Sequence, residues 1–211
     1  MGYSIGMSIL PYIYLASQSP RRAELLKQIG VNFQPLLLSD DPRRLAEVDE
    51  TPLINESAAD YVQRICRAKA EAAWESMHFR KLPLAPVLAA DTTVVVDNKI
   101  IGKPRDNNDA ATILRLLSGR QHQVLTAVAV KLHQRIETRL SITNVTFAQL
   151  SEERIQRYVS SGKSQDKAGA YGIQGLAGAF VERIEGSYSG VVGLPLFETV
   201  QLLNLFGYPT P

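Results

Sequence analysis

The chain has 211 residues, a length that fits one large domain or two small lobes around a cleft. Hydrophobic residues make up 45% of the chain and charged residues 21%, enough to bury a core, and the single cysteine, Cys66, excludes an intramolecular disulfide framework. With 23 Lys and Arg against 21 Asp and Glu, the net charge of +2 is too balanced to indicate a nucleic-acid-binding or membrane-binding protein.

The N-terminal segment is apolar but lacks the positive region of a signal peptide, because no Lys or Arg precedes Arg21. No apolar run reaches the length of about 18 residues that a membrane span needs. We therefore expect a cytoplasmic protein that folds as a single domain over residues 1–211, with residues 1–11 as a short flexible leader.

The first predicted elements form a strand, a tight turn and a helix. Residues 12–16 are a compact apolar run and predict a buried strand. Ser19 suits the N-cap of a helix, Pro20 its first position and Gly30 its end. A second strand is predicted over residues 31–38.

An acidic, proline-containing stretch over residues 39–55 predicts an exposed loop. Ser57 with Asp60 resembles a capping box that opens a helix through about residue 76. Residues 87–90 and 92–96 are strand-like, so Asp91 is expected where an apolar strand ends. A turn and a short returning strand follow over residues 97–101.

The rest of the chain reads as short helices and hairpins. The predicted elements are a helix from Asp106 to about 118, paired strands at 123–132 and 136–147, a helix at 151–160, strands near 179–184 and 188–192, and a last helix at 195–206. This mixture predicts an α/β fold with a mixed, twisted sheet, flanking helices and two lobes around a cleft.

Four polar residues occupy the predicted turn between the first strand and helix: Ser17, Ser19, Arg21 and Arg22. The N–H groups at the start of a helix bind anions, and arginines add bidentate contacts to phosphate. The turn therefore suits a phosphate site, and a solvated helix start with two surface arginines is the equal alternative.

Asp91 is a second candidate, because a carboxylate within apolar sequence is rare unless it is paired or binds a cation. Lys103 follows the predicted hairpin, which folds it back toward Asp91, and Lys69 lies on the long helix. A carboxylate, two lysines and two arginines suit a polyphosphate bound with a divalent metal, if they converge. Each lysine alone is more commonly a solvent-exposed residue.

Several short motifs follow one another along the chain. They are Ser17-Gln18-Ser19-Pro20-Arg21-Arg22, Arg67-Ala68-Lys69-Ala70, Ala90-Asp91-Thr92, Gly102-Lys103-Pro104, Leu117-Ser118-Gly119, Asp166-Lys167-Ala168-Gly169-Ala170-Tyr171-Gly172-Ile173-Gln174-Gly175 and Gly193-Leu194-Pro195. In this order and spacing they resemble the Maf family of nucleotide pyrophosphatases over residues 12–206.

The resemblance implies a fold related to the inosine-triphosphate pyrophosphatases, usually as a homodimer. It implies hydrolysis of a nucleoside triphosphate between the α and β phosphates, with a divalent cation such as Mg²⁺ or Mn²⁺. Asp91 matches the family's proton acceptor and metal residue, Lys69 and Lys103 its phosphate-binding lysines, Arg21 a substrate-specificity position and Arg22 a residue that supports the phosphates.

Thr92 and the segment that carries Gln174 resemble the branch of the family that acts on dTTP and UTP. The amide of Gln174 offers a donor and an acceptor, which match the imide edge of thymine or uracil. Arg21 supplies further donors to a ring carbonyl.

The family's acidic metal-associated residue after the second strand is matched by Asp40, with Asp41 in reserve. Here Pro42-Arg43-Arg44 replaces the more usual acidic stretch, which is a departure from the family pattern.

Two other functions remain open from the sequence. One is a pyrophosphatase for modified nucleotides that cleans the nucleotide pool. The other is a nucleotide-binding regulator of cell division in which hydrolysis is incidental. No basic stripe interleaved with aromatic residues is present, so we expect neither a stable nucleic-acid partner nor a membrane partner.

Overall fold

The computed structural model describes residues 11–38 and 48–210. Within these residues a seven-stranded mixed sheet has the order β2-β1-β3-β5-β6-β7, and β4 pairs with β3 off this path. The strands are β1 (Ile13–Leu15), β2 (Phe33–Pro35), β3 (Val87–Val96), β4 (Lys99–Ile101), β5 (Gln121–Leu132), β6 (Arg135–Phe147) and β7 (Val181–Glu185). β1 runs parallel to β2 and β3, and the other pairs are antiparallel.

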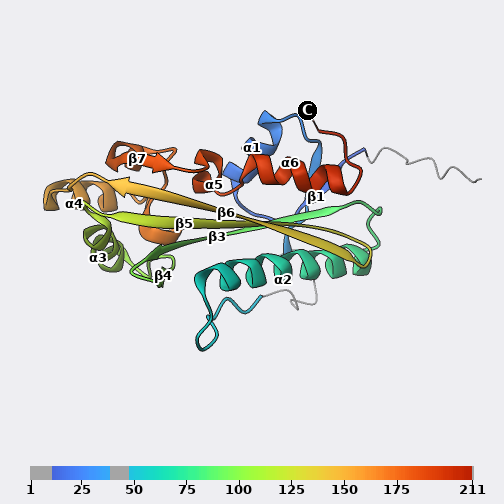
Figure 1. The fold of residues 1–211 in the computed structure, drawn as a ribbon, viewed down its shortest axis with the longest axis horizontal. Helices are drawn as coiled ribbons and strands as arrows, with labels where there is room; N and C mark the ends of the chain where they lie inside the picture. Colours follow the sequence, from blue (N-terminus) through green and yellow to red (C-terminus); the bar gives the residue numbers. More distant parts are fainter. Residues whose placement is uncertain (1–10, 39–47, 211) are drawn as a thin grey trace, which may run out of the picture.

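Helices cover both faces of this sheet (Figure 1). The long α2 lies along one face, α1 and α6 lie on the other, and α3 and α4 gather at one end of the long strands. The helices are α1 (Pro20–Gln28), α2 (Ala58–Phe79), α3 (Asn107–Leu117), α4 (Glu152–Ser160), α5 (Tyr188–Val192) and α6 (Leu196–Leu205), with 3₁₀ turns at Ala168–Ala170 and Leu176–Phe180. None of the helices in the described part of the chain is both long and apolar enough to cross a membrane.

The alternation of side chains along β3 divides the core into two clusters. Val87, Ala89 and Val95 pack in the cluster that α2 covers. Leu88 and Val94 belong to the cluster on the opposite face, with residues of α1 and α6. By the same alternation, Asp91 points toward α2 and its neighbour Thr92 points toward the other face.

The predicted helix starts are confirmed where the sequence supplies a cap. The hydroxyl of Ser57 accepts a hydrogen bond from the N–H of Asp60, and the carboxylate of Asp106 accepts one from Asp109. Ser19 is the N-cap of α1, as predicted, but its side chain makes no capping bond; the N–H of Ser19 donates to the hydroxyl of Ser17 instead.

Two predictions of secondary structure are wrong in a way that matters for the site. Asp91 does not end a strand, because β3 runs without interruption from Val87 to Val96. The strand predicted near residues 188–192 is the short helix α5, whose first turn is capped by the Ser187 hydroxyl, which accepts from Gly190 N–H. β2 is also shorter than the predicted second strand.

Candidate active site

A gap along one edge of β3 creates the cleft. β1 pairs with this edge as far as Leu88, and β4 resumes the pairing at Val94. Between them, residues 89–93 have no strand partner on that edge in the described structure. Because β1 stops there, side chains from both faces of β3 reach the same opening, a cleft of about 890 Å³.

Asp91, Lys69 and Glu50 form a three-member ion cluster on the α2 side of this cleft. The Nζ of Lys69 lies 2.6 Å from Oδ1 of Asp91 and 2.6 Å from Oε1 of Glu50. The Asp91 side chain is only 12% exposed. The lysine therefore links a carboxylate in the sheet with one in the loop that precedes α2.

The charged groups of this cluster shift one another's pKa values. Burial alone would lower the pKa of Lys69, but the two carboxylates outweigh burial and raise it above its ordinary value. Burial alone would raise the pKa of Glu50, but the hydrogen bond and charge of Lys69, with Lys103 and Arg22, hold it below its ordinary value. Lys69 and Glu50 are therefore both charged at neutral pH.

Arg22 connects four parts of the chain behind the cleft. Its Nε donates to the carbonyl of Gly193 at 2.8 Å, and its terminal nitrogens donate to the hydroxyls of Ser17 at 3.2 Å and Thr92 at 3.3 Å. Burial lowers its pKa below the ordinary value, and Asp91 partly offsets this. The Thr92 hydroxyl also lies 3.1 Å from that of Thr126 on β5.

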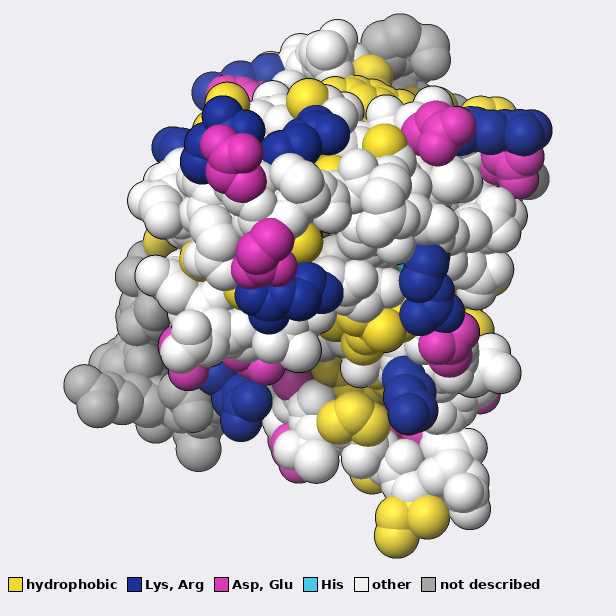
Figure 2. Space-filling model, turned by 90° about the vertical axis from the view of Figure 1, so that its left-hand side faces the viewer, with side chains coloured by type: hydrophobic (Ala, Val, Ile, Leu, Met, Phe, Trp, Pro, Cys, Tyr) yellow, Lys and Arg dark blue, Asp and Glu magenta, His cyan; other side chains and the backbone are white. Residues whose placement is uncertain are grey.

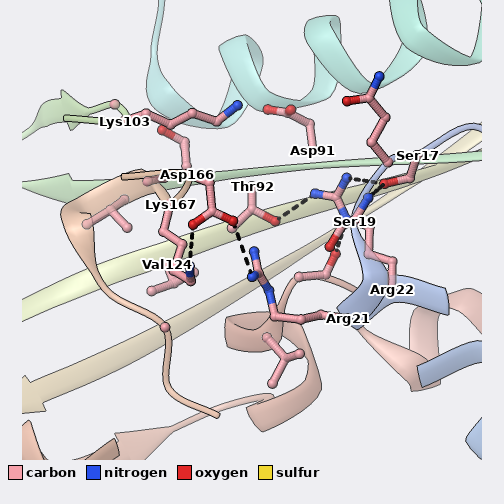
Figure 3. Close-up of a pocket in the computed structure, with 18 of the residues that line it drawn as sticks. Ser17, Ser19, Arg21, Arg22, Asp91, Thr92, Lys103, Val124, Asp166 and Lys167 are labelled. Carbon is pink, nitrogen blue, oxygen red and sulfur yellow. Dashed lines mark hydrogen bonds and ion pairs between the residues drawn. The ribbon is translucent and has the colours of Figure 1, made fainter. Parts of the chain in front are cut away.

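Arg21, the residue before it on α1, instead reaches across the cleft (Figure 3). Its guanidinium lies 3.7 Å from the carboxylate of Asp166, which also pairs with the ammonium group of Lys167. Figure 3 shows Lys103 on the same side of the opening as Asp91, opposite Arg21.

The predicted site residues converge. Nine of them line this one cleft: Ser17, Ser19, Arg21, Arg22, Lys69, Asp91, Thr92, Lys103 and Gln174. Asp40, the candidate metal residue, lies outside the described residues, as does its reserve Asp41.

Three cleft residues were missed by the sequence analysis: Glu50, Asp166 and Lys167. The sequence predicts an exposed loop around Glu50, and no local pattern marks this residue as different from the other acidic residues there. Asp166 and Lys167 stand in a quoted motif but were given no role.

Cys66 and His122 are buried within the fold. Burial raises the pKa of the Cys66 thiol to about 12, so Cys66 is not a nucleophile at neutral pH. The ring of His122 lies with its Nε2 2.8 Å from the Tyr171 hydroxyl, and Tyr171 lines the cleft.

The residues of the cleft fit a divalent cation that arrives with phosphate. No group of three or more His, Cys, Asp and Glu side chains gathers as a metal site among the described residues. Asp91 and Glu50 nonetheless hold a cationic nitrogen between their oxygens. Magnesium ions are commonly bound through one or two carboxylates plus substrate phosphates, and this donor set has that form.

The charge of the lining indicates what the cleft binds. Arginine and lysine side chains outnumber carboxylates there: Arg21, Arg22, Lys69, Lys103 and Lys167 against Glu50, Asp91 and Asp166. The helix dipole at the start of α1 adds to this positive potential. Fold and site together define an α/β protein with a polyphosphate-binding cleft.

Comparison with known proteins identifies the family. The chain belongs to the Maf family, because the model of that family, described as "Maf-like protein", matches residues 12–206. A dTTP/UTP pyrophosphatase of Nitrosomonas europaea is 56% identical over 92% of this chain and 94% of its own length. One of Aromatoleum aromaticum is 54% identical over 93% of this chain and 96% of its own.

Among solved structures, the Ham1 protein of Staphylococcus aureus matches 67% of this chain and 72% of its own length, with a TM-score of 0.44 and 16% sequence identity.

Proposed function

We propose that this protein hydrolyses dTTP and UTP between the α and β phosphates, releasing the nucleoside monophosphate and pyrophosphate. The observation that carries the proposal is the position of Asp91, a carboxylate beside Lys69 within a cleft otherwise rich in phosphate-binding cations. The high identity to curated dTTP/UTP pyrophosphatases over nearly the whole chain supports the same reaction.

In the proposed reaction, Asp91 orients a water molecule and accepts its proton while the water oxygen attacks the α-phosphorus. The bond between the α-phosphorus and the bridging oxygen breaks, and pyrophosphate leaves with the electron pair. Lys69 and Lys103 stabilise the charge that develops on this leaving group.

Asp91 and Glu50 are the residues that would hold a divalent cation. When bound, such a cation neutralises phosphate charge and favours attack by the electron-rich oxygen of water. Lys69 must then give up at least one of its two carboxylate partners, and the phosphates of the substrate are the natural replacement for it.

Recognition of the base is assigned to Arg21, Thr92 and Gln174. Arg21 and Gln174 both line the cleft. Thr92 acts through Arg22: its hydroxyl accepts a hydrogen bond from the Arg22 guanidinium and helps to hold that group behind the cleft. Gln174 offers one donor and one acceptor to the imide edge of a pyrimidine.

The regulator alternative is not favoured, because relatives 56% and 54% identical over nearly the whole chain are named dTTP/UTP pyrophosphatases. The surface charge separately gives no support for a nucleic-acid partner. Figure 2 shows the end of the molecule that carries α3 and α4, where basic side chains are interspersed with acidic ones. Arg115 pairs there with Glu152, and Arg120 with Asp97. The described residues of this face form no continuous positive surface of the kind that nucleic-acid phosphates require.

The test is a substrate panel. Purified protein is incubated with Mg²⁺ and each canonical nucleoside triphosphate, together with 7-methylguanosine triphosphate, and released pyrophosphate is measured. We expect preferential turnover of dTTP and UTP. Preference for the methylated guanosine nucleotide would refute the assigned base recognition, and no turnover of any nucleotide would refute the proposed activity.

A further inference from the structure

Glu50 reaches the cleft from a segment without regular structure. Residues 48–57 contain neither helix nor strand, yet the Glu50 carboxylate lies 2.6 Å from Lys69 Nζ. A loop ordinarily holds a side chain less firmly than a helix or strand does. The position of Glu50 therefore depends on the contacts that hold this segment against α2.

Arg64, on α2, makes the main contacts with it. Its Nε lies 2.6 Å from Oε1 of Glu56, and one terminal nitrogen lies 2.7 Å from Oε2, so the two groups form a bidentate pair. The same nitrogen donates to the carbonyl of Thr51 at 3.1 Å. One guanidinium thus holds the segment at two points.

The carboxylate of Glu56 is well enclosed, with its side chain only 7% exposed. It also accepts a hydrogen bond from the N–H of Leu53 at 3.0 Å. The hydrogen bond from Arg64 lowers the pKa of Glu56 to about 2, which keeps it ionised at any pH where the enzyme would act. Both partners of this pair are therefore charged, and the pair joins the segment to α2.

Tyr61 supplies a second attachment, at Glu50 itself. Its hydroxyl donates to the Glu50 carbonyl at 2.9 Å, and the Arg64 guanidinium lies 5.6 Å from the centre of the Tyr61 ring. Both residues are on the first turns of α2. Tyr61 and Arg64 thereby contact the backbone at Glu50 and at Thr51, the residue that follows it.

We propose that Arg64 is a positioning residue for the reaction, which acts by holding residues 50–56 so that Glu50 faces Lys69 and Asp91. This inference rests on the proposed function, in which Glu50 shares the cation and phosphate site with Asp91. Arg64 is not among the residues that line the cleft, whereas Glu50 is, and the route of its effect in this proposal is Glu50.

Lysine cannot replace arginine in this role. The planar guanidinium matches both carboxylate oxygens while still reaching the Thr51 carbonyl, whereas an ammonium group is a single point charge. Arg64→Lys keeps the positive charge but cannot form the bidentate pair with Glu56 together with the hydrogen bond to Thr51. We expect it to lower kcat by about 10–100-fold, the usual effect of losing a residue that orients a metal-associated ligand.

A double-mutant cycle with Glu50→Gln tests the route of the effect. If Arg64 acts through Glu50, Arg64→Lys lowers kcat in the wild-type background and has little further effect in the Glu50→Gln background. Equal losses in both backgrounds would overturn the proposal, and so would an unchanged kcat for Arg64→Lys. If Arg64→Lys does not fold, Glu56→Gln takes its place in the same cycle.

Arg115→Lys is the matched control. Arg115 forms a similar fork with Glu152, at 2.8 and 2.5 Å, between α3 and α4 and away from the cleft. We expect Arg115→Lys to leave kcat unchanged. That result would show that losing a bidentate pair does not by itself lower kcat.

Amide hydrogen exchange gives a readout that does not depend on activity. Arg64→Lys is expected to increase exchange at least about tenfold at the N–H of Leu53, which the Glu56 carboxylate holds. Unchanged exchange would refute the holding role even in an active enzyme. A wild-type protein that hydrolyses no nucleotide would refute the proposed function, while exchange would still decide whether Arg64 holds the segment.

Discussion

The ammonium nitrogen of Lys69 lies 2.6 Å from the carboxylate of Asp91, and Glu50 contacts the same nitrogen at the same distance. The two acidic groups thus share a cation that belongs to the chain itself. Lys69 occupies oxygen atoms that a divalent ion would otherwise use, and its charge repels that ion.

Binding of Mn²⁺ to the nucleotide-free protein tests this relationship. We expect weak binding by the wild type, and binding at least about tenfold tighter by Lys69→Met, because one unit of repulsion is removed from the site. Electron paramagnetic resonance of free Mn²⁺ measures both. Lys103→Met is the control, since Lys103 lines the same cleft but forms no ion pair with Asp91 or Glu50 among the described residues. Its charge acts on Glu50 only from a distance, so we expect Lys103→Met to tighten Mn²⁺ binding less than Lys69→Met does. Equal affinities for wild type and Lys69→Met would contradict the account.

Arg21 and Arg22 are neighbours in the chain, but we expect Arg22 to stabilise the fold and Arg21 to bind substrate. Arg22→Lys is expected to lower the free energy of unfolding by about 1.5–3 kcal/mol, because its bonds to Ser17, Thr92 and Gly193 cannot all be kept by one ammonium. Arg21→Lys is expected to change stability by less than about 0.5 kcal/mol, since its pair with the exposed Asp166 is long.

Denaturant unfolding and steady-state kinetics on both variants check this pair. Arg21→Lys should raise KM for dTTP while the unfolding midpoint stays near that of the wild type. The reverse pattern, with Arg21 important for stability and Arg22 dispensable, would show that the two residues have been assigned the wrong way round.

Gln174 is expected to affect pyrimidine nucleotides selectively. Gln174→Ala removes a neutral donor and acceptor from the cleft, which corresponds to about 2–12-fold in kcat/KM for each lost hydrogen bond. The loss should appear for dTTP and UTP and be smaller for ATP and GTP. An equal loss with all four nucleotides would show that Gln174 does not read the base.

His122 makes stability depend on pH. Burial lowers its pKa from the ordinary value of 6.5 to about 4. Between these values the unfolded chain takes up a proton that the folded protein excludes, so this contribution to stability is complete above pH 6.5 and is lost as the pH falls toward 4. It amounts to on the order of 3 kcal/mol.

The measurement compares Tyr171→Phe with Tyr171→Phe/His122→Phe, so that no Tyr171 hydroxyl is left without its partner. Free energies of unfolding are determined from pH 7 to pH 4.5. The single variant should lose stability more steeply than the double variant. Parallel curves would mean that His122 is not kept neutral by the fold.

Much of the fold follows from local sequence. The caps at Ser57 and Asp106 predict the starts of α2 and α3 because a side-chain oxygen and a nearby N–H suffice to form them. α5 was missed because its apolar, partly β-branched residues resemble a strand, and the Ser187 cap was not recognised.

The site was predictable only in part. A charged residue within an apolar run predicts the end of a strand, whereas Asp91 lies inside β3, beyond the point where β1 stops pairing and leaves an opening. The opening beside Asp91 depends on where β1 ends, and the sequence around Asp91 contains no information about the length of that strand. The position of Glu50 depends on the ion pair between Arg64 and Glu56, a tertiary contact that the local sequence does not reveal.

Hydrolysis of dTTP in ¹⁸O-labelled water by the wild type and by Asp91→Asn tests whether water attacks the α-phosphorus with Asp91 as its base. We expect ¹⁸O in dTMP and none in pyrophosphate, and a loss of about 10²–10⁴-fold in kcat for a variant that remains folded. Label in pyrophosphate or in inorganic phosphate, or a folded Asp91→Asn protein with the wild-type rate, would contradict it.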